Sequence, residues 1–376
     1  MSKGLQMFST LEESGTLKVG LKQVDIPTPA DHEVVVRIEA SPINPSDLGV
    51  MFGPADINSA TTEGEGTYSV LTAPVHPSFL PRFKERLGQD LVVGNEGAGV
   101  VIAAGNSPEA QALMGKTVGV AGGSMYAQYR AVPAAMCLPV ADGTPARDAA
   151  SCFVNPMTAL GMVETMRMEG HTALVHTAAA SNLGQMLNKV CQADGIELVN
   201  IVRKQEQVDI LKGLGAKYII NSTDDDFMVQ LIDAIQETGA TLAFDATGGG
   251  ELASQILTAM EQALLRTPQP YSIYGTTVQK QVYIYGSLDF APTTLNRAYG
   301  MTWSVGGWLL TNFLAKAGME KIVELQTRVA TELKTTFASS YTSELSFAEM
   351  LSADIAKQYN AKTTGEKYLL CPQKGL

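Results

Sequence analysis

The stretch His176-Thr177-Ala178-Ala179-Ala180-Ser181-Asn182-Leu183-Gly184 decides the fold that this sequence predicts. It follows an apolar run, 172–178 (TALVHTA), that is typical of a buried strand, and it opens a segment, 182–194, whose apolar residues recur at helical spacing. Small residues at such a turn let the backbone approach a phosphate closely, and the free amides of a helix N-terminus bind anions. Alanine-rich turns between a strand and a helix also occur where no ligand binds. The flanking sequence therefore has to distinguish a phosphate-binding turn from one that only packs the helix against the strand.

After this turn the chain alternates between strand-like and helix-like segments. This order predicts a doubly wound α/β domain with a parallel sheet of about six strands. A further apolar and glycine-bearing stretch, Tyr299 to Trp308, is expected to be an edge strand. We expect strands at 197–202, 217–221, 241–246 and 282–286 and helices at 205–214, 224–237 and 250–266.

The first 140 residues or so have a different pattern. Residues 33–40 (EVVVRIEA) alternate apolar and polar side chains, and similar short runs follow at 98–103, 117–121 and 126–132. Glycine and proline separate these runs, which indicates a small antiparallel barrel or sandwich.

Two long segments, 53–90 and 266–281, interrupt the regular order of elements. Loops of this length are uncommon in compact domains, so both are expected to be functional, lid-like insertions or else tolerated surface loops.

Composition excludes several classes of partner. The 376 residues are 45% hydrophobic and 17% charged, with a net charge of −11. Such a chain buries a large core, and its acidic surface repels nucleic acid and anionic membranes. The first ten residues contain no apolar leader, and no apolar run is long enough to span a bilayer, so we expect a cytoplasmic protein without nucleic-acid or membrane partners.

The end of the second expected strand of the α/β domain indicates which anion the turn binds. In a dinucleotide site an acidic residue about 20 positions after the turn holds the ribose hydroxyls. Here Arg203 and Lys204 occupy that place. Because a guanidinium binds a phosphate that a carboxylate would repel, we predict NADPH rather than NADH; the alternative is a solvated basic loop.

Nearly the whole chain resembles the quinone oxidoreductase and enoyl-thioester reductase branches of the medium-chain dehydrogenase/reductase superfamily. The resemblance implies a fold class of α/β with a doubly wound Rossmann domain at 151–311 and a GroES-like β-rich catalytic domain at 1–150 and 312–376. The blocks that carry it occur in the family's order: Ile43-Asn44-Pro45-Ser46-Asp47, Gly94-Asn95-Glu96-Gly97, Val154-Asn155-Pro156-Met157-Thr158-Ala159, Phe244-Asp245-Ala246-Thr247-Gly248-Gly249, Gly306-Gly307-Trp308-Leu309-Leu310-Thr311-Asn312 and Thr364-Gly365-Glu366-Lys367-Tyr368-Leu369-Leu370.

Carried over residue by residue, the resemblance assigns a set of cofactor contacts. Asn44 and Thr158 would line the nicotinamide cleft, Lys367 would lie near it, and Arg203 and Lys204 would bind the 2′-phosphate. The remaining expected contacts are Ala180, Ser181, Asn182, Leu183 and Gly184 at the pyrophosphate, and Thr247, Gly248, Gly286, Ser287 and Leu288 along the cofactor. Loop capping is an alternative role for Thr247 and Ser287.

No metal is expected. Zinc members of the superfamily hold the metal with cysteine and histidine, whereas the corresponding blocks here carry Asn44 to Asp47 and Asn95. Neutral amides are poor zinc ligands. The four cysteines lie far apart in the sequence and are interpreted as buried small residues.

Without a Lewis acid, hydride addition suits an acceptor that delocalises charge, such as a quinone or an activated alkene. Asn44 is the preferred hydrogen-bond donor to the developing oxyanion. Enoyl-thioester reductases use a tyrosine acid soon after the Asn-Pro-Ser-Asp block, but Gly53-Pro54-Ala55 follows here, and Tyr68 in the 53–90 segment is the remaining candidate. This departure favours quinone reduction, while residues 94–97 and 180–185 look closer to the enoyl-thioester reductases.

Three questions stay open in the sequence. Arg82, Lys84 and Arg86 are either a basic entry patch for a thioester substrate or solvated charges. A cofactor-binding protein without turnover is an alternative from another functional class. The apolar edge strand and the resemblance both favour a homodimer.

Overall fold

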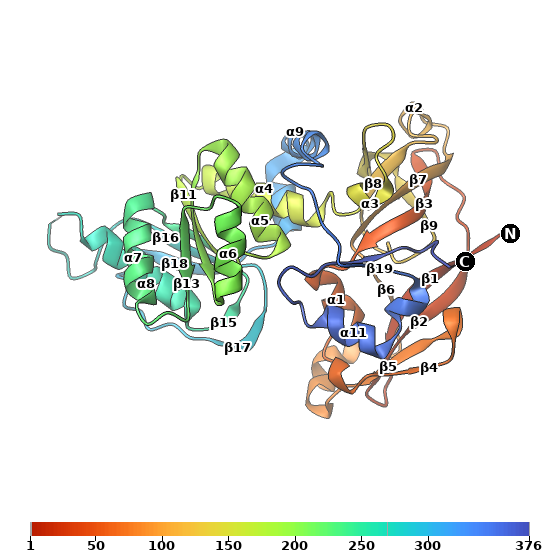
Figure 1. Ribbon diagram of the computed structural model, residues 1–376, viewed down its shortest axis with the longest axis horizontal. Coiled ribbons are helices and arrows are strands. Elements are labelled where there is room, and N and C mark those ends of the chain that lie inside the picture. The colour runs from red at the N-terminus through yellow and green to blue at the C-terminus, as the bar shows by residue number, and fades with distance from the viewer. Residues whose placement is uncertain (1, 269, 376) are drawn as a thin grey trace. The chain divides into compact units, whose positions relative to one another are not determined.

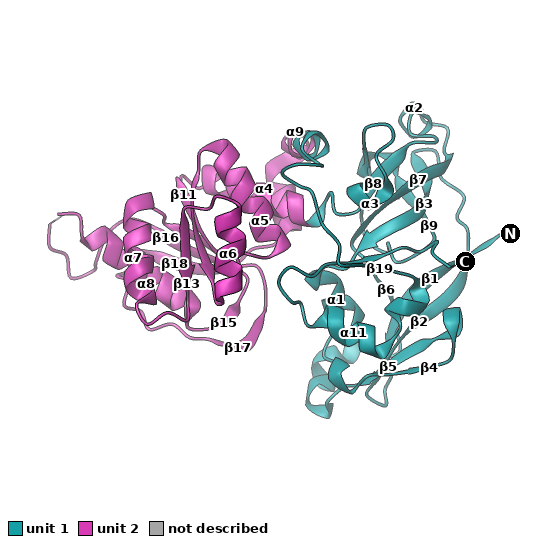
Figure 2. Ribbon diagram, in the orientation of Figure 1, with its two compact units in different colours: residues 1–154, 326–376 teal, residues 155–325 magenta. Residues whose placement is uncertain are grey.

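The computed structural model describes residues 2–268 and 270–375, and the chain divides into two compact units (Figure 2). Unit 1 comprises Met1–Val154 and Gln326–Leu376, and unit 2 comprises Asn155–Leu325. Unit 2 is therefore an insertion into unit 1. The sequence placed these boundaries after residues 150 and 311. The helix α9 (Leu310–Thr331) contains the second boundary and is interrupted at Gly318, whose φ is +81°.

Unit 2 is built on a six-stranded parallel sheet, as predicted. The order of its strands is β13-β12-β11-β14-β16-β18. The order reverses between β11 and β14, and ligands of such sheets bind beyond the carboxyl ends of the strands at the reversal. The strands, labelled in Figure 1, are β11 (Ala173–Thr177), β12 (Glu197–Val202), β13 (Tyr218–Asn221), β14 (Leu242–Asp245), β16 (Lys280–Ile284) and β18 (Trp303–Gly307).

Helices connect these strands close to the predicted positions. The helix α5 begins after Ser181, whose hydroxyl accepts a hydrogen bond from the N–H of Gly184, and it ends at Gly195, where φ is +67°. A short parallel pair, β15 (Gly248–Gly250) and β17 (Asp289–Thr293), lies outside the main sheet. The helices that begin in this part of the chain are α4 (Val154–Met168), α5 (Asn182–Asp194), α6 (Gln205–Gly213), α7 (Phe227–Thr238), α8 (Leu252–Leu265) and α9.

Unit 1 contains two sheets, in the orders β4-β5-β2-β1-β6 and β10-β8-β7-β3-β20-β19, with β9 paired to β3. All pairs are antiparallel except β19 with β20. The strands are β1 (Lys3–Leu11), β2 (Thr16–Asp25), β3 (Glu33–Pro42), β4 (Thr61–Glu63), β5 (Val70–Pro74), β6 (Asp90–Val92), β7 (Glu96–Ala104), β8 (Thr117–Ala121), β9 (Tyr129–Pro133), β10 (Cys137–Pro139), β19 (Ser343–Leu345) and β20 (Tyr368–Leu370).

Short helices join the strands of unit 1. The strands β19 and β20 follow unit 2 in the sequence, so the end of the chain completes the sheet that begins with β3. The helices are α1 (Pro45–Met51), α2 (Pro108–Gln111), α3 (Ala146–Ala149), α10 (Phe347–Met350) and α11 (Ala353–Asn360), with 3-10 turns η1 (Ile57–Ser59), η2 (Gly66–Tyr68), η3 (Pro77–Arg86) and η4 (Ala134–Met136).

The 53–90 segment corrects a prediction. It is not an unstructured insertion, because β5 pairs with both β2 and β4 and buries Leu71 and Ala73 in the core. The strands are short, and glycine and proline separate them, so their alternation was not visible in the sequence. This segment is part of the sheet of unit 1 and not a separate lid.

The connection between α8 and β16 stays at the surface. It extends from unit 2 as a loop in Figure 1, and the side chains of Tyr271 and Ile273 are 90% and 74% exposed. Its end is anchored by a buried ion pair, 2.8 Å long, between Lys280 Nζ and Glu261 Oε2. Among the residues that the structure describes, no helix combines the length and apolar character that a membrane span requires.

Candidate cofactor site

The turn after β11 has the geometry of an anion site. Ala178 takes a positive φ of 51°, which turns the chain sharply out of the strand. A Cβ atom added to Gly184 would lie 2.2 Å from the carbonyl oxygen of Ala179, so only glycine lets α5 pass this close to the turn. Ser181 caps the helix at 3.1 Å. The turn is thereby held against the start of α5.

Two backbone donors in this turn are left for a ligand. In residues 2–268 and 270–375, no hydrogen bond occupies the N–H of Ala180 or of Leu183. Leu183 is in the first turn of α5, and Ala180 lies just before the helix. The helix dipole favours an anion at this position. The predicted pyrophosphate contacts Ala180 to Gly184 therefore form one compact turn.

A buried carboxylate connects the ends of β11 and β14. Asp245 Oδ1 accepts a hydrogen bond from Thr177 Oγ1 at 2.7 Å, and the same hydroxyl accepts the N–H of Ala246 at 2.8 Å. These are the two strands between which the sheet order reverses. Asp245 was missed as a site residue because its role depends on a partner 68 positions away.

Asp245 also determines which groups of Thr247 and Gly248 are available for hydrogen bonds to a cofactor. Its carboxylate accepts the N–H of Thr247 at 2.8 Å and that of Gly248 at 3.0 Å. The carbonyl of Thr247 accepts the N–H of Asp289, and that of Gly248 accepts the Thr293 hydroxyl. Because these backbone groups are already paired, the hydroxyl of Thr247 is the group left to contact a cofactor.

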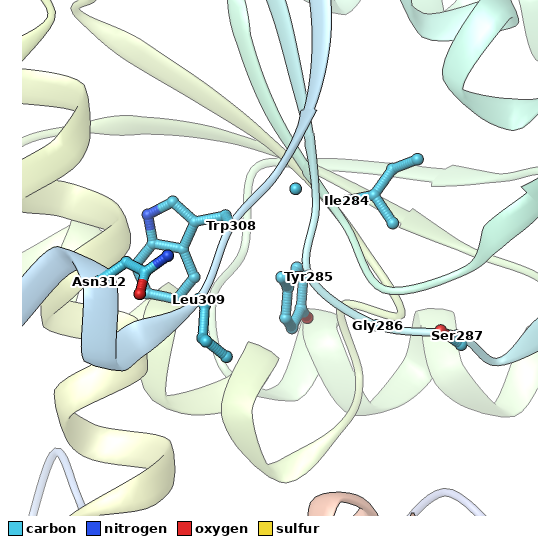
Figure 3. A pocket seen from close by; sticks show the side chains of 8 residues that line it. Ile284, Tyr285, Gly286, Ser287, Trp308, Leu309 and Asn312 are labelled. Carbon is cyan, nitrogen blue, oxygen red and sulfur yellow. The ribbon is translucent and has the colours of Figure 1, made fainter. Parts of the chain in front are cut away.

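A cavity of about 350 Å³ lies at the carboxyl ends of β16 and β18. Figure 3 shows Trp308 and Leu309, which follow β18, beside Tyr285, which follows β16. A second cavity of about 220 Å³ adjoins β15 and β17, and Gly286 and Ser287 line both cavities. The first cavity is lined by Ile284, Tyr285, Gly286, Ser287, Gly307, Trp308, Leu309 and Asn312.

Tyr285 is held in place by His176. Tyr285 Oη lies 2.7 Å from His176 Nε2, and the two rings stack with centroids 5.8 Å apart. His176 is fully buried, which lowers its pKa to about 3, so the imidazole is neutral at physiological pH. This pair fixes one wall of the larger cavity.

Arg203 and Lys204 lie where β12 ends and α6 begins. Both residues are exposed, and none of the ion pairs in the described part of the chain involves either of them. The N–H of Arg203 donates to Gln207 Oε1 at 3.0 Å, which holds the backbone while the guanidinium stays exposed. The end of β12 therefore offers an anion two exposed cations.

Unit 1 contains a buried polar cluster around Asn44, which precedes α1. Asn44 Nδ2 donates to Glu96 Oε1 at 2.8 Å, and the N–H of Asn44 donates to Asp47 Oδ2 at 2.8 Å. The other oxygen of Asp47 accepts the N–H of Asn95 at 2.8 Å. These bonds join the block around Asn44 to the block around Asn95. Asn44 is only 2% exposed. Its hydrogen bond to Glu96 uses one of the two hydrogens of its side-chain amide.

Burial changes the acid-base properties of this cluster. It raises the pKa of Asp47 to about 7, assisted by the nearby charge of Glu96, although backbone donors oppose the shift. It lowers the pKa of Lys367 to about 8, while Glu96 and Asp47 act in the opposite direction. Lys367 is 7% exposed and interacts electrostatically with both carboxylates.

Comparison with known proteins shows similarity to several reductases. The chain is 31% identical over 208 residues to the mitochondrial enoyl-acyl-carrier-protein reductase of Xenopus tropicalis, over 53% of this chain and 51% of that protein. It is 25% identical to mouse prostaglandin reductase-3 over 86% of this chain and 76% of that protein. A putative NADPH:quinone reductase from Mesorhizobium loti superposes over 99% of both chains with a TM-score of 0.73 and 22% identity. These similarities support the resemblance to the medium-chain dehydrogenase/reductase superfamily that the sequence motifs indicate.

The matched regions differ in extent. The chain spans about half the length of the enoyl reductases from frog, mouse and rat that it matches. The zinc-binding dehydrogenase family matches residues 183–264, which run from α5 to α8. That segment contains neither Asn44 nor Asn95. The Rossmann and GroES-like architecture predicted from the sequence is confirmed.

The structure brings most of the predicted residues of unit 2 to one edge of its sheet. Thr158 is buried in α4, and Leu288 is 49% exposed. Tyr68 is 84% exposed in η2, and its hydroxyl makes no hydrogen bond within the described residues. Its role as a proton donor stays a prediction from the sequence. Among residues 2–268 and 270–375, no group of three or more His, Cys, Asp or Glu side chains could hold a metal ion.

Proposed function

We propose that this protein is an NADPH-dependent reductase that passes a hydride to a quinone or an activated alkene. The observation that carries the proposal is the pair of exposed cations, Arg203 and Lys204, beside a strand-to-helix turn with unpaired amides. Together they provide sites for a 2′-phosphate and a pyrophosphate.

The residues present fit NADPH. The amides of Ala180 and Leu183 would bind the pyrophosphate, and Arg203 with Lys204 would bind the 2′-phosphate. The cavity beside Tyr285 and Trp308 lies at the carboxyl edge of the same sheet and offers space for a planar ring. When bound, the cofactor supplies the hydride, while the chain orients it and keeps water away.

The polar groups of unit 1 favour an electron-poor acceptor. Asn44 and Asn95 stand where zinc members of the superfamily carry metal ligands, and amides do not polarise a carbonyl as zinc does. An acceptor that delocalises negative charge needs less help. The second amide hydrogen of Asn44 is the group that we assign to the developing oxyanion, since Glu96 uses only one.

Enoyl-thioester reduction is the second candidate. The similarity to mitochondrial enoyl-acyl-carrier-protein reductases favours it. In the 3-10 turn η3, Arg82 and Lys84 are exposed, and they would suit a phosphate-bearing carrier. Arg86 is a weaker candidate, because its guanidinium donates to Ser9 Oγ and to the carbonyl of Val50 at the end of α1.

One assay tests the proposal. Purified protein with NADPH is offered quinones, enones and enoyl-CoA esters while the absorbance of the reduced nicotinamide is followed. We expect oxidation of NADPH with quinones or enones. Activity on enoyl-CoA alone would favour the second candidate, and NADPH binding without oxidation by any acceptor would indicate a binding protein. We also expect elemental analysis of the purified protein to find no stoichiometric zinc.

We also propose a homodimer. Within residues 2–268 and 270–375, the strand β18 is at the end of the sheet order and pairs with β16 alone, so its other edge has no strand partner. A second copy can pair with that edge about a two-fold axis. Light scattering at micromolar concentration should give twice the chain mass, and a monomer would contradict this part of the proposal.

A further inference from the structure

Glu96 binds two parts of unit 1 with one carboxylate. It is the first residue of β7 and is completely buried. Oε1 accepts the hydrogen bond from Asn44 Nδ2, while Oε2 accepts the N–H groups of Phe153 and Val154, each at 2.8 Å. Val154 is the first residue of α4, so Glu96 also satisfies amides at the start of that helix.

Ionised Glu96 allows only one orientation of the Asn44 amide. A carboxylate accepts hydrogen bonds and cannot donate them, so the amide nitrogen of Asn44 has to face it. The oxygen of the amide and its second hydrogen then face elsewhere. All three groups around the two oxygens of Glu96 are donors, which is the arrangement expected for an ionised carboxylate.

The charge of Glu96 is compensated locally. Burial raises the pKa of its carboxyl, and Lys367 and the three donors act against that shift. The titratable groups that face it come from several elements or the segments before them: Asp47 in α1, Tyr126 before β9, Cys152 before α4, Tyr341 before β19 and Lys367 before β20.

We propose that Glu96 is a positioning residue that sets the orientation of the Asn44 amide and, with its other oxygen, fixes the start of α4. Its effect on turnover rests on the proposed reductase function, because it acts through Asn44. α4 also carries the predicted contact Thr158. One charged side chain thus holds both the Asn44 amide and the first amide of the helix that carries Thr158.

Glu96→Gln tests the proposal with little change of shape. If the oxygen of the new amide stays with Phe153 and Val154, its nitrogen faces Asn44, and the Asn44 amide has to turn round to avoid two donors facing each other. Glu63→Gln is the matched control, because Glu63 is exposed in β4 and makes no ion pair in the part of the chain that the structure describes.

The first readout needs no activity. In side-chain amide NMR spectra with labelled asparagine, the Asn44 signal is identified by its absence in Asn44→Ala. We expect this signal to take a new position in Glu96→Gln and to stay unchanged in Glu63→Gln. An unchanged Asn44 signal in Glu96→Gln would overturn the proposal.

The second readout is turnover. With a quinone that the native protein reduces, Glu96→Gln should lower kcat at least about tenfold and leave the Kd of NADPH unchanged, since the cofactor turn is in unit 2. Adding Glu96→Gln to Asn44→Ala should cause no further loss, whereas additive losses would contradict action through Asn44. If no acceptor is reduced, the proposed function fails, and the NMR result still decides the role of Glu96.

Discussion

The hydroxyl of Thr177 and the carboxylate of Asp245 meet at 2.7 Å, where the order of the sheet in unit 2 reverses. Through this contact the loop after β11 and the loop after β14 are held by one buried acid, which also binds the N–H groups of Thr247 and Gly248. This buried acid therefore organises the edge at which a dinucleotide would bind.

Replacing Asp245 by asparagine should loosen this edge. The amide offers one acceptor in place of two and directs a nitrogen at backbone N–H groups, so we expect the free energy of unfolding to fall by about 2 kcal/mol. The affinity for NADPH should fall with it. Urea denaturation checks the stability, with Asp225→Asn on the exposed loop before α7 as the control. Equal midpoints for the two variants would contradict the role of Asp245.

Gly184→Ala should disturb the turn directly. The new Cβ would lie 2.2 Å from the carbonyl oxygen of Ala179, so α5 has to move away from the turn. We expect a loss of about 2 kcal/mol in stability together with weaker NADPH binding. Gly213→Ala is the matched control, because nothing lies within 4 Å of its Cβ position near the end of α6. That variant should be as stable as the native protein or more so.

His176 predicts an acid-sensitive term in stability. Burial lowers its pKa to about 3 from an ordinary value of 6.5, so the folded state keeps the neutral form. Its contribution is present above pH 6.5 and is lost as the pH falls towards 3, by an amount on the order of 4 kcal/mol. The unfolding free energy of His176→Asn should decline less steeply over this range, while exposed His32→Asn should follow the native curve. Parallel curves for all three proteins would refute this assignment.

The sequence predicted the sheet of unit 2 well because its strands are buried on both faces. All five residues of β11 are buried, and such a strand is a plain apolar run. In β1, by contrast, the inward positions include Gly4 and Ser9 as well as Met7, so no alternation was visible. The short strands of the 53–90 segment were missed for a similar reason.

The candidate site was predictable where its residues are local in sequence. The turn at Ala180 to Gly184 follows from its neighbours. Asp245 and Glu96 act through partners far along the chain, 68 and 52 positions away. A buried carboxylate is costly unless donors surround it, and only the fold shows where those donors are.

The selection of NADPH by Arg203 is the central claim, and the dissociation constants of NADPH and NADH test it most directly. The protein has two tryptophans, and Trp308 lines the larger cavity, so quenching of its fluorescence reports binding. We predict that the native protein binds NADPH more tightly, and that Arg203→Glu weakens NADPH at least about tenfold and leaves NADH as tight or tighter. Lys212→Glu, the same charge change on exposed α6, should alter neither constant. Equal affinities of native protein and Arg203→Glu for both cofactors would contradict the account.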